Sequence, residues 1–183
     1  MEEEIIYACG HSEMHVKSQR SAVNAIFVRN AARKVCKTCM AEHEARRKGM
    51  ISNSIQRTKE AVADRKLTGT EKQIKWGDEI RENWLDNIKR QITPHYLQSI
   101  FEKTQSSGAS PDAVERSKTN VLAVRLAAID EMLTHGEAGW WIKSFKNQHL
   151  DLLISSRTDE AIKAEFTTMS NAIAVHTAQL ELF

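Results

Sequence analysis

The sequence predicts a mainly α-helical protein in which a small N-terminal Cys/His zinc module is joined to a helical bundle, with little or no sheet. Helices are favoured because the 183 residues include only 7 Gly and 2 Pro, and because apolar residues recur at steps of three and four along much of the chain. The Cys and His residues near the N-terminus predict the metal module. A hydrophobic fraction of 41% and a charged fraction of 27% are typical of a globular protein.

Residues 1–66 are expected to form a basic zinc-binding module with helices. The short apolar stretch 5–8 indicates a strand or an extended segment. Helical spacing predicts a helix over 18–34, from the apolar residues Ala22, Val23, Ile26, Phe27, Ala31 and Val35. A polar helix is predicted over 40–66, with a thin apolar stripe of Met50, Ile51, Ile55, Ala61 and Val62.

Residues 67–183 are expected to form a helical domain, and the loop at 106–111 is a candidate boundary within it. The clearest helix is 67–92, whose apolar face repeats at steps of four. Thr68 or Thr70 can cap it, and Thr68 with Glu71 fits a capping box. Its apolar face comprises Trp76, Ile80, Trp84, Leu85, Ile88 and Ile92. Pro94 is expected to end or kink this helix, and residues 96–101 suggest a short one after it.

The next helix should begin at Ser110, a fitting N-cap followed by Pro111, and Gly136 is positioned to end it. Its expected core residues are Val114, Leu122, Leu126, Ile129 and Leu133. After it, the residues offered to the core are Trp140, Trp141, Ile142, Phe145 and Leu152. A last helix is predicted over 158–182. Tryptophans at helical spacing are expected to pack in the core rather than to form a binding surface.

Two pairs of residues, Cys9 with His11 and Cys36 with Cys39, are the predicted zinc ligands. The Cys-x-x-Cys spacing lets a tight turn present two thiolates to one ion. Gly10 gives the first pair a turn that other residues disfavour. His15 and His43 remain alternatives to His11 as the fourth ligand. Four filled positions predict a structural zinc ion rather than a catalytic one.

Positive charge is concentrated in the N-terminal part of the chain. Residues 1–66 hold 13 Lys and Arg against 8 Asp and Glu, net +5, whereas residues 67–183 hold 13 against 16, net −3. Such asymmetry indicates a nucleic acid or an acidic protein as partner, or a solvated basic face. The candidate partner or nucleic-acid surface comprises Arg29, Arg33, Lys34, Lys37, Arg46, Arg47 and Lys48, with Lys17 and Arg20 beside it. Phe27 is the only Phe, Trp or Tyr between His11 and Lys66, so base-stacking platforms are scarce.

Several stretches resemble a group of proteins carried by bacteria, their phages and other mobile elements: CGH at 9–11, CKTC at 36–39, LTGTEKQIKWGDEIR at 67–81 and, more loosely, AGWWIKSF at 138–145. Only the 67–81 stretch is specific. Gly77 stands where the group usually has Ala, and Lys143 where Asp is common. The resemblance implies a zinc-ribbon-like start and an action on host machinery, such as inhibition of a host defence system.

The sequence favours a non-enzymatic protein that acts by binding a protein partner. It contains no Gly-rich phosphate loop, nucleophile elbow or HExxH motif. The triplet Glu71-Lys72-Gln73 is interpreted as the first turn of a helix. No transmembrane run or signal peptide is recognisable, so a cytoplasmic location without a membrane partner is expected. A nucleic-acid-binding accessory or regulatory protein is the alternative, and the oligomeric state stays open.

Overall fold

The computed structural model describes residues 2–16, 21–64, 66–91, 109–146 and 149–180. These residues form β1 (Glu2–Ile6), β2 (Ser12–Val16), α1 (Ser21–Ala31), α2 (Lys37–Asp64), α3 (Glu71–Gln91), α5 (Pro111–Met132), α6 (Ala138–Lys146) and α7 (His149–Leu180). The prediction of a mainly α-helical protein with little sheet is confirmed. The predictions for Lys17, Arg20, Pro94 and the helix at 96–101 lie outside the described residues.

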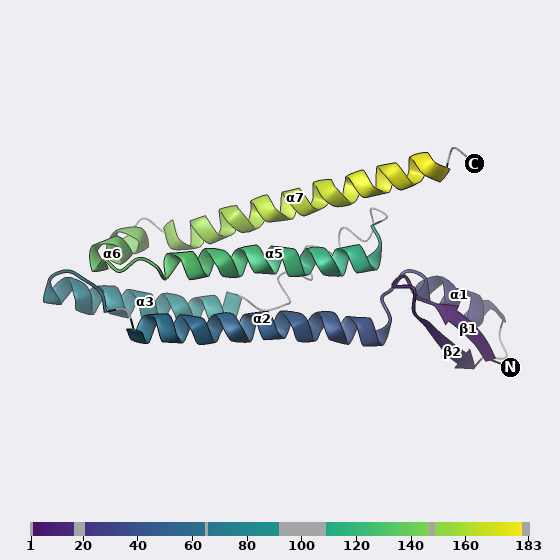
Figure 1. The fold of residues 1–183 in the computed structure, drawn as a ribbon, viewed down its shortest axis with the longest axis horizontal. Helices are drawn as coiled ribbons and strands as arrows, with labels where there is room; N and C mark the ends of the chain where they lie inside the picture. Colours follow the sequence, from purple (N-terminus) through teal and green to yellow (C-terminus); the bar gives the residue numbers. More distant parts are fainter. Residues whose placement is uncertain (1, 17–20, 65, 92–108, 147–148, 181–183) are drawn as a thin grey trace.

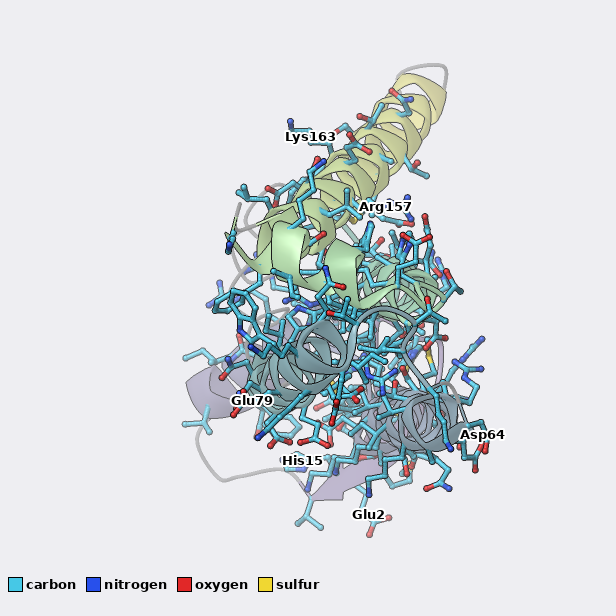
Figure 2. The ribbon with its side chains drawn as sticks, turned by 90° about the vertical axis from the view of Figure 1, so that its left-hand side faces the viewer. Glu2, His15, Asp64, Glu79, Arg157 and Lys163 are labelled. Atoms are coloured by element: carbon cyan, nitrogen blue, oxygen red, sulfur yellow. The ribbon has the colours of Figure 1, made fainter. Side chains whose placement is uncertain are left out.

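The strands and α1 lie together at one end of the molecule, where α2 begins (Figure 1). From there α2 runs along the bundle, and α5 packs against both α2 and α7. At the opposite end, α3 packs against the short helix α6. Viewed along the bundle, Lys163 of α7 lies on the opposite side from Glu2 and His15 of the strands (Figure 2). Helix α2 therefore belongs to the bundle and also leads directly out of the strand-containing end.

Helix α5 supplies much of the hydrophobic core. All five residues expected there are buried, namely Val114, Leu122, Leu126, Ile129 and Leu133. Leu150, Ile154, Ile162 and Met169 of α7 are also buried. Burying each such side chain contributes about 1.5–3 kcal/mol relative to leaving it in water. The core is therefore centred on α5 and on the helices at its sides.

The start of α5 is as predicted, and α3 is capped by Thr70, one of the two predicted caps, but through a different capping box. The Ala113 N–H donates to the Ser110 hydroxyl over 3.2 Å, and Pro111 takes the first position of α5. In α3, the Gln73 N–H lies 3.4 Å from the Thr70 hydroxyl oxygen, and the Thr70 N–H donates to the Gln73 side-chain oxygen over 3.0 Å. The capping box is therefore Thr70 with Gln73, and the Thr68 with Glu71 box was wrong.

Thr68 instead joins the segment before α3 to the segment that leads into α6. Its N–H donates to the Gly136 carbonyl over 2.8 Å, and the Ala138 N–H donates to the Thr68 carbonyl over 3.0 Å. Helix α5 ends at Met132, with Leu133 as a right-handed C-cap. The prediction that Gly136 ends α5 was therefore wrong, because the helix has already ended at Met132, and the Gly136 carbonyl accepts instead from Thr68.

The tryptophans divide between core and surface. Trp84 and Trp141 are buried and meet edge to face, with ring centroids 5.4 Å apart. Trp140 is half-buried and stacks on the His135 ring. Trp76 is 42% exposed, with the Lys146 ammonium 5.1 Å from its ring centroid. The expectation of a core position is therefore confirmed for two of the four and wrong for Trp76.

Phe145 and Leu152 were also expected in the core, but they are exposed. In α6 the buried positions are Ala138, Trp141 and Ser144, three residues apart, so Phe145 falls just beyond the buried stripe. Helix α7 begins at His149 rather than at 158, and its buried stripe starts at Leu150 and Ile154. Leu152 lies between these two positions and consequently faces solvent.

None of the helices in the described part of the chain is both long enough and apolar enough to cross a membrane.

Candidate metal centre

The first pair of candidate ligands comes from the turn between β1 and β2. These strands pair antiparallel, with Ile6 opposite Ser12. In the turn, the Tyr7 N–H donates to the His11 carbonyl and the Gly10 N–H to the Tyr7 carbonyl, both over 2.9 Å. Gly10 has a φ of 80°, a conformation that side-chain-bearing residues rarely adopt. This tight turn brings Cys9 and His11 to the same end of the hairpin.

The second pair lies at the start of α2. Cys36 immediately precedes the helix, and the Cys39 N–H lies 3.4 Å from the Cys36 sulfur. The sulfur thus accepts from the first helical turn in the manner of an N-cap side chain. The positive end of the helix dipole also favours negative charge on both sulfurs.

A backbone contact joins the two pairs. The Ala8 N–H donates to the Lys34 carbonyl over 3.0 Å, and the Cys36 N–H donates to the Cys9 sulfur over 3.3 Å. Ala31, at the end of α1, and Val35 are buried at this junction. The hairpin turn is therefore fixed against the segment that leads into α2.

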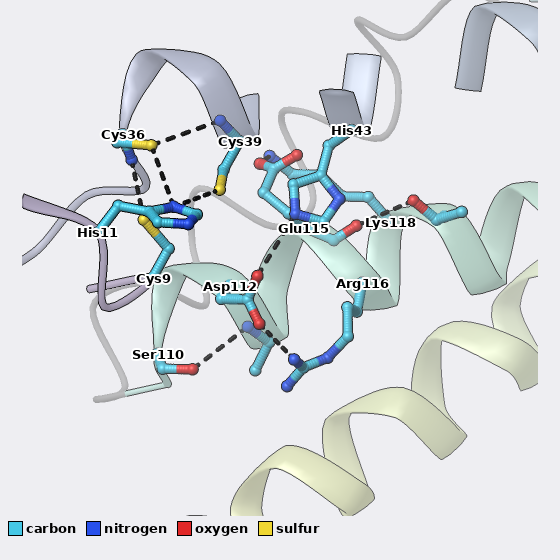
Figure 3. A network of polar contacts seen from close by, with 12 residues as sticks. Cys9, His11, Cys36, Cys39, His43, Ser110, Asp112, Glu115, Arg116 and Lys118 are labelled. Atoms are coloured by element: carbon cyan, nitrogen blue, oxygen red, sulfur yellow. Dashed lines mark hydrogen bonds and ion pairs between the residues drawn. The ribbon is translucent and has the colours of Figure 1, made fainter. Parts of the chain in front are cut away.

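Four side chains converge at this junction (Figure 3). The donor atoms of Cys9, His11, Cys36 and Cys39 all lie within 4.8 Å of one another. His11 directs its Nδ1 atom toward the other residues, 3.1 Å from the Cys39 sulfur and 3.7 Å from the Cys36 sulfur. In a tetrahedral zinc site with Zn–S bonds of 2.3 Å, two sulfurs lie about 3.8 Å apart. The cluster therefore has the donor set and the size to bind one metal ion.

The other two candidate histidines have different neighbours. The His15 ring stacks on Phe27, with centroids 4.1 Å apart and planes 9° from parallel. The His43 Nε2 atom lies 3.4 Å from a carboxylate oxygen of Asp112 in α5. Neither belongs to the four-residue cluster, so His11 is the histidine that the structure brings to the cysteines.

The thiols of the cluster have unequal pKa values. Burial raises the pKa of Cys9, but hydrogen bonds with the backbone of Cys36 and His11 outweigh it and lower that pKa to about 6. Burial, together with hydrogen bonds to the sulfurs of Cys36 and Cys9, raises the pKa of Cys39 to about 12. Neighbouring thiolates repel one another, which favours the protonated form of Cys39. A divalent cation would compete with that proton for the sulfur.

Most of the residues predicted to form a basic surface are exposed, namely Arg29, Arg33, Lys34, Lys37, Arg46 and Lys48. Arg47 is the exception and corrects the prediction, because it is only 5% exposed. Its guanidinium donates to a Glu115 oxygen over 2.7 Å, and the Lys118 ammonium donates to the other oxygen over 2.6 Å. The Arg47 side chain therefore joins α2 to α5 and is not available to a partner.

Several polar residues at the junction of α2 with α5 were not identified from the sequence. Buried Arg47, Ser54 and Thr58 continue the helical repeat of the thin apolar stripe on α2. That repeat could have predicted their burial, because polar residues on the same helix face as Met50 and Ile51 are turned toward the core together with them. Their partners on α5, including Glu115, required the tertiary structure.

Comparison with known proteins finds no matching family model, no similar curated protein and no similar solved structure.

Proposed function

We propose that the protein is non-enzymatic, that Cys9, His11, Cys36 and Cys39 bind a structural zinc ion, and that the N-terminal part so stabilised binds a protein partner. The convergence of these four donors carries the proposal. It links the hairpin to the segment between α1 and α2 and to the start of α2, and four of the six exposed cations, Arg29, Arg33, Lys34 and Lys37, lie from α1 to the first residue of α2.

Support for zinc comes from the chemistry of the donors. Three thiolates and one imidazole form a common ligand set of structural zinc sites, and they leave no position open for a substrate. Binding would also require the displacement of the Cys39 proton. The ion would hold the hairpin turn against α2, because neither segment alone supplies more than two donors.

Metal analysis of the purified protein tests the site. We expect one zinc ion per chain, and its loss on Cys39→Ser substitution. His43→Gln is the matched control, because this histidine lies at the Asp112 side chain and outside the cluster, so the variant should retain its zinc. Full zinc in Cys39→Ser, or iron in place of zinc, would contradict the assignment.

The proposal of a protein partner is supported by a cationic surface in which aromatic side chains are scarce. The resemblance to proteins of phages and other mobile elements makes a host protein or complex, such as part of a defence system, the first class to test. A pull-down from bacterial lysate, with and without nuclease, separates the two functions. A partner retained after nuclease treatment supports protein binding.

Nucleic-acid binding is the alternative, and the six exposed cations favour it. Contacts with phosphates would make the affinity fall steeply as the salt concentration rises. Loss of every captured protein after nuclease treatment, together with salt-steep binding to DNA or RNA, would replace the protein-binding proposal by this one.

A further inference from the structure

Helix α1 has an apolar face that the rest of the described chain leaves uncovered. Val23, Ile26 and Phe27 are 47%, 49% and 39% exposed, and their spacing places them side by side on the helix. By contrast, Ala31 and Val35 are 4% and 6% exposed. The apolar spacing that predicted this helix thus contains a buried end and an exposed stripe. Contiguous exposed apolar side chains are more informative than scattered ones.

The fold explains why this stripe is not part of a core. The adjoining sheet has only two strands, and Ile5 is its buried apolar residue. Ile5 lies opposite Glu13 on the other strand, so these two side chains share one face of the sheet. His15 is two residues after Glu13 and therefore lies on that same face. Phe27 stacks on the His15 ring, which holds one end of the stripe in place. The stripe is therefore fixed at the rim of a small module.

Positive charge lies beside the C-terminal end of the stripe. Between Glu13 and Glu42 the chain contains 6 Lys and Arg residues and no Asp or Glu. Arg29 follows Ile26 by three residues and is its neighbour on the helix surface, and Arg33 lies in the turn after α1. Both arginines are exposed. The surface thus combines a narrow apolar stripe with two exposed cations, Arg29 and Arg33, at its C-terminal end.

We infer that α1 is the docking site for an acidic amphipathic helix of the protein partner, an inference that rests on the proposed function. The apolar side of such a helix would cover Val23, Ile26 and Phe27, and its carboxylates would face Arg29 and Arg33. A nucleic acid would match the cations but leave the aliphatic side chains without a complementary surface. A second copy of α1 would bring its own Arg29 and Arg33 to the interface, where carboxylates are needed. Charge complementarity therefore selects the acidic helix.

Two synthetic peptides provide the direct test. The first is an amphipathic helix of about 18 residues, five turns, with a leucine stripe flanked by glutamates. The second is its twin, with lysines in place of the glutamates. We expect saturable binding of the acidic peptide to the zinc-loaded full chain, with NMR shifts centred on α1. The lysine twin should bind at least about tenfold more weakly, and added salt should weaken the acidic peptide.

Variants of the full chain link this binding to α1. Ile26→Asp should weaken the acidic peptide at least about tenfold, and Ile26→Ser should do so without adding charge. Leu152→Asp is the matched control, because Leu152 is 62% exposed in the first turn of α7, and α7 begins at the end of the bundle opposite α1 (Figure 1). It should leave binding unchanged. Replacing Arg29 and Arg33 together by Glu should reverse the preference, so that the lysine twin binds better. Zinc content and circular dichroism verify that each variant is folded.

Other outcomes would overturn the inference. These are unchanged binding by folded Ile26→Asp and Ile26→Ser, equal affinity for the twins, and binding of neither peptide. Self-association of the free chain that Ile26→Asp abolishes would assign the stripe to a second copy. Binding to phosphatidylserine vesicles in place of the peptide would assign it to lipid. If Ile26→Asp still captured the nuclease-resistant partner, the protein-binding function would stand and only this docking site would be wrong.

Discussion

Gly77 lies where α3 approaches the start of α6 most closely. A Cβ atom there would lie 2.9 Å from Leu67 Cδ1 and 3.1 Å from both Cα and Cβ of Ala138. The resemblance of 67–81 led us to expect alanine at this position, so Gly77 is a departure from that expectation. The structure gives it a steric reason. Such a reason was not predictable from the sequence, because Ala138 is distant along the chain.

We expect Gly77→Ala to lower the free energy of unfolding by about 1–3 kcal/mol, because the methyl group forces the α3 and α6 backbones apart. Urea denaturation at neutral pH measures the change. Gly49→Ala in α2 is the control, because no atom lies within 4 Å of its added Cβ. It should stabilise the protein by up to about 1 kcal/mol through helix propensity. If Gly77→Ala were equally stabilising, the close approach would be wrong.

The Glu115 carboxylate is 3% exposed and holds two cations. Burial raises its pKa, but hydrogen bonds from Lys118 and Arg47 outweigh burial and lower the pKa below the ordinary value. The charged Glu115 carboxylate therefore contributes its full stabilisation above the pKa that it has in the unfolded chain. This stabilisation is lost as the pH falls through its lower pKa in the folded protein. Glu115→Gln should cost about 3 kcal/mol at neutral pH, because two buried cations lose their counter-charge.

Urea denaturation of the parent and of Glu115→Gln, from pH 7 down to pH 3, tests this account. The difference between the two proteins should shrink below about pH 4.5, where carboxylates gain protons. Glu131→Gln provides the control, because the Glu131–Arg157 ion pair is largely exposed. It should have a much smaller effect. A difference for Glu115→Gln that stayed constant over this pH range would contradict a charged Glu115.

At the scale of elements, spacing predicted helices well and the faces that they bury less well. Ser110 and Pro111 predicted the start of α5 because the signal is local. The apolar repeat on α1 predicted a helix, yet Ile26 is exposed because the adjoining hairpin is too small to cover it. Arg47 appeared to be a surface cation, because its carboxylate partner lies on a helix far along the chain.

Substitutions at the start of α3 test whether its capping box is Thr70 with Gln73. Thr70→Ala should lower the free energy of unfolding by about 1 kcal/mol, because the Gln73 N–H loses its acceptor. Glu71→Ala should cost less than half as much, because Glu71 contributes only through the helix dipole. Thermal or urea denaturation of the two variants compares them. A larger loss in Glu71→Ala would restore the capping box that begins at Thr68.

For the whole molecule, the spacing of the cysteines was sufficient to predict a Cys/His cluster able to hold a metal ion. It did not determine which histidine joined the cysteines, because His15 and His43 also lie within six residues of a cysteine. The structure resolves this through the Gly10 turn, which presents His11, while Asp112 takes His43. The types of donor atom could therefore be predicted from the sequence, whereas the choice of histidine depends on tertiary contacts.

Removing the metal should affect the two ends of the molecule differently. The four donors belong to the hairpin turn and to the start of α2, whereas α5 and α7 bury their own apolar residues against each other. After chelation we expect hydrogen exchange to accelerate in β1, β2, α1 and the first turns of α2. Amides in α5 and α7 should stay protected, because local opening follows the contacts that are lost.

Hydrogen exchange followed by mass spectrometry locates this change, and Cys39→Ser should reproduce it without a chelator. Addition of zinc should restore protection in the parent but not in that variant. Uniform loss of protection through α7 would mean that the ion stabilises the whole molecule as one cooperative unit. Unchanged hydrogen exchange in the hairpin after chelation would contradict a structural role for the metal ion. Selective opening would instead make the surface of α1 dependent on zinc, because α1 packs against β1 of the hairpin and leads through a short segment into α2.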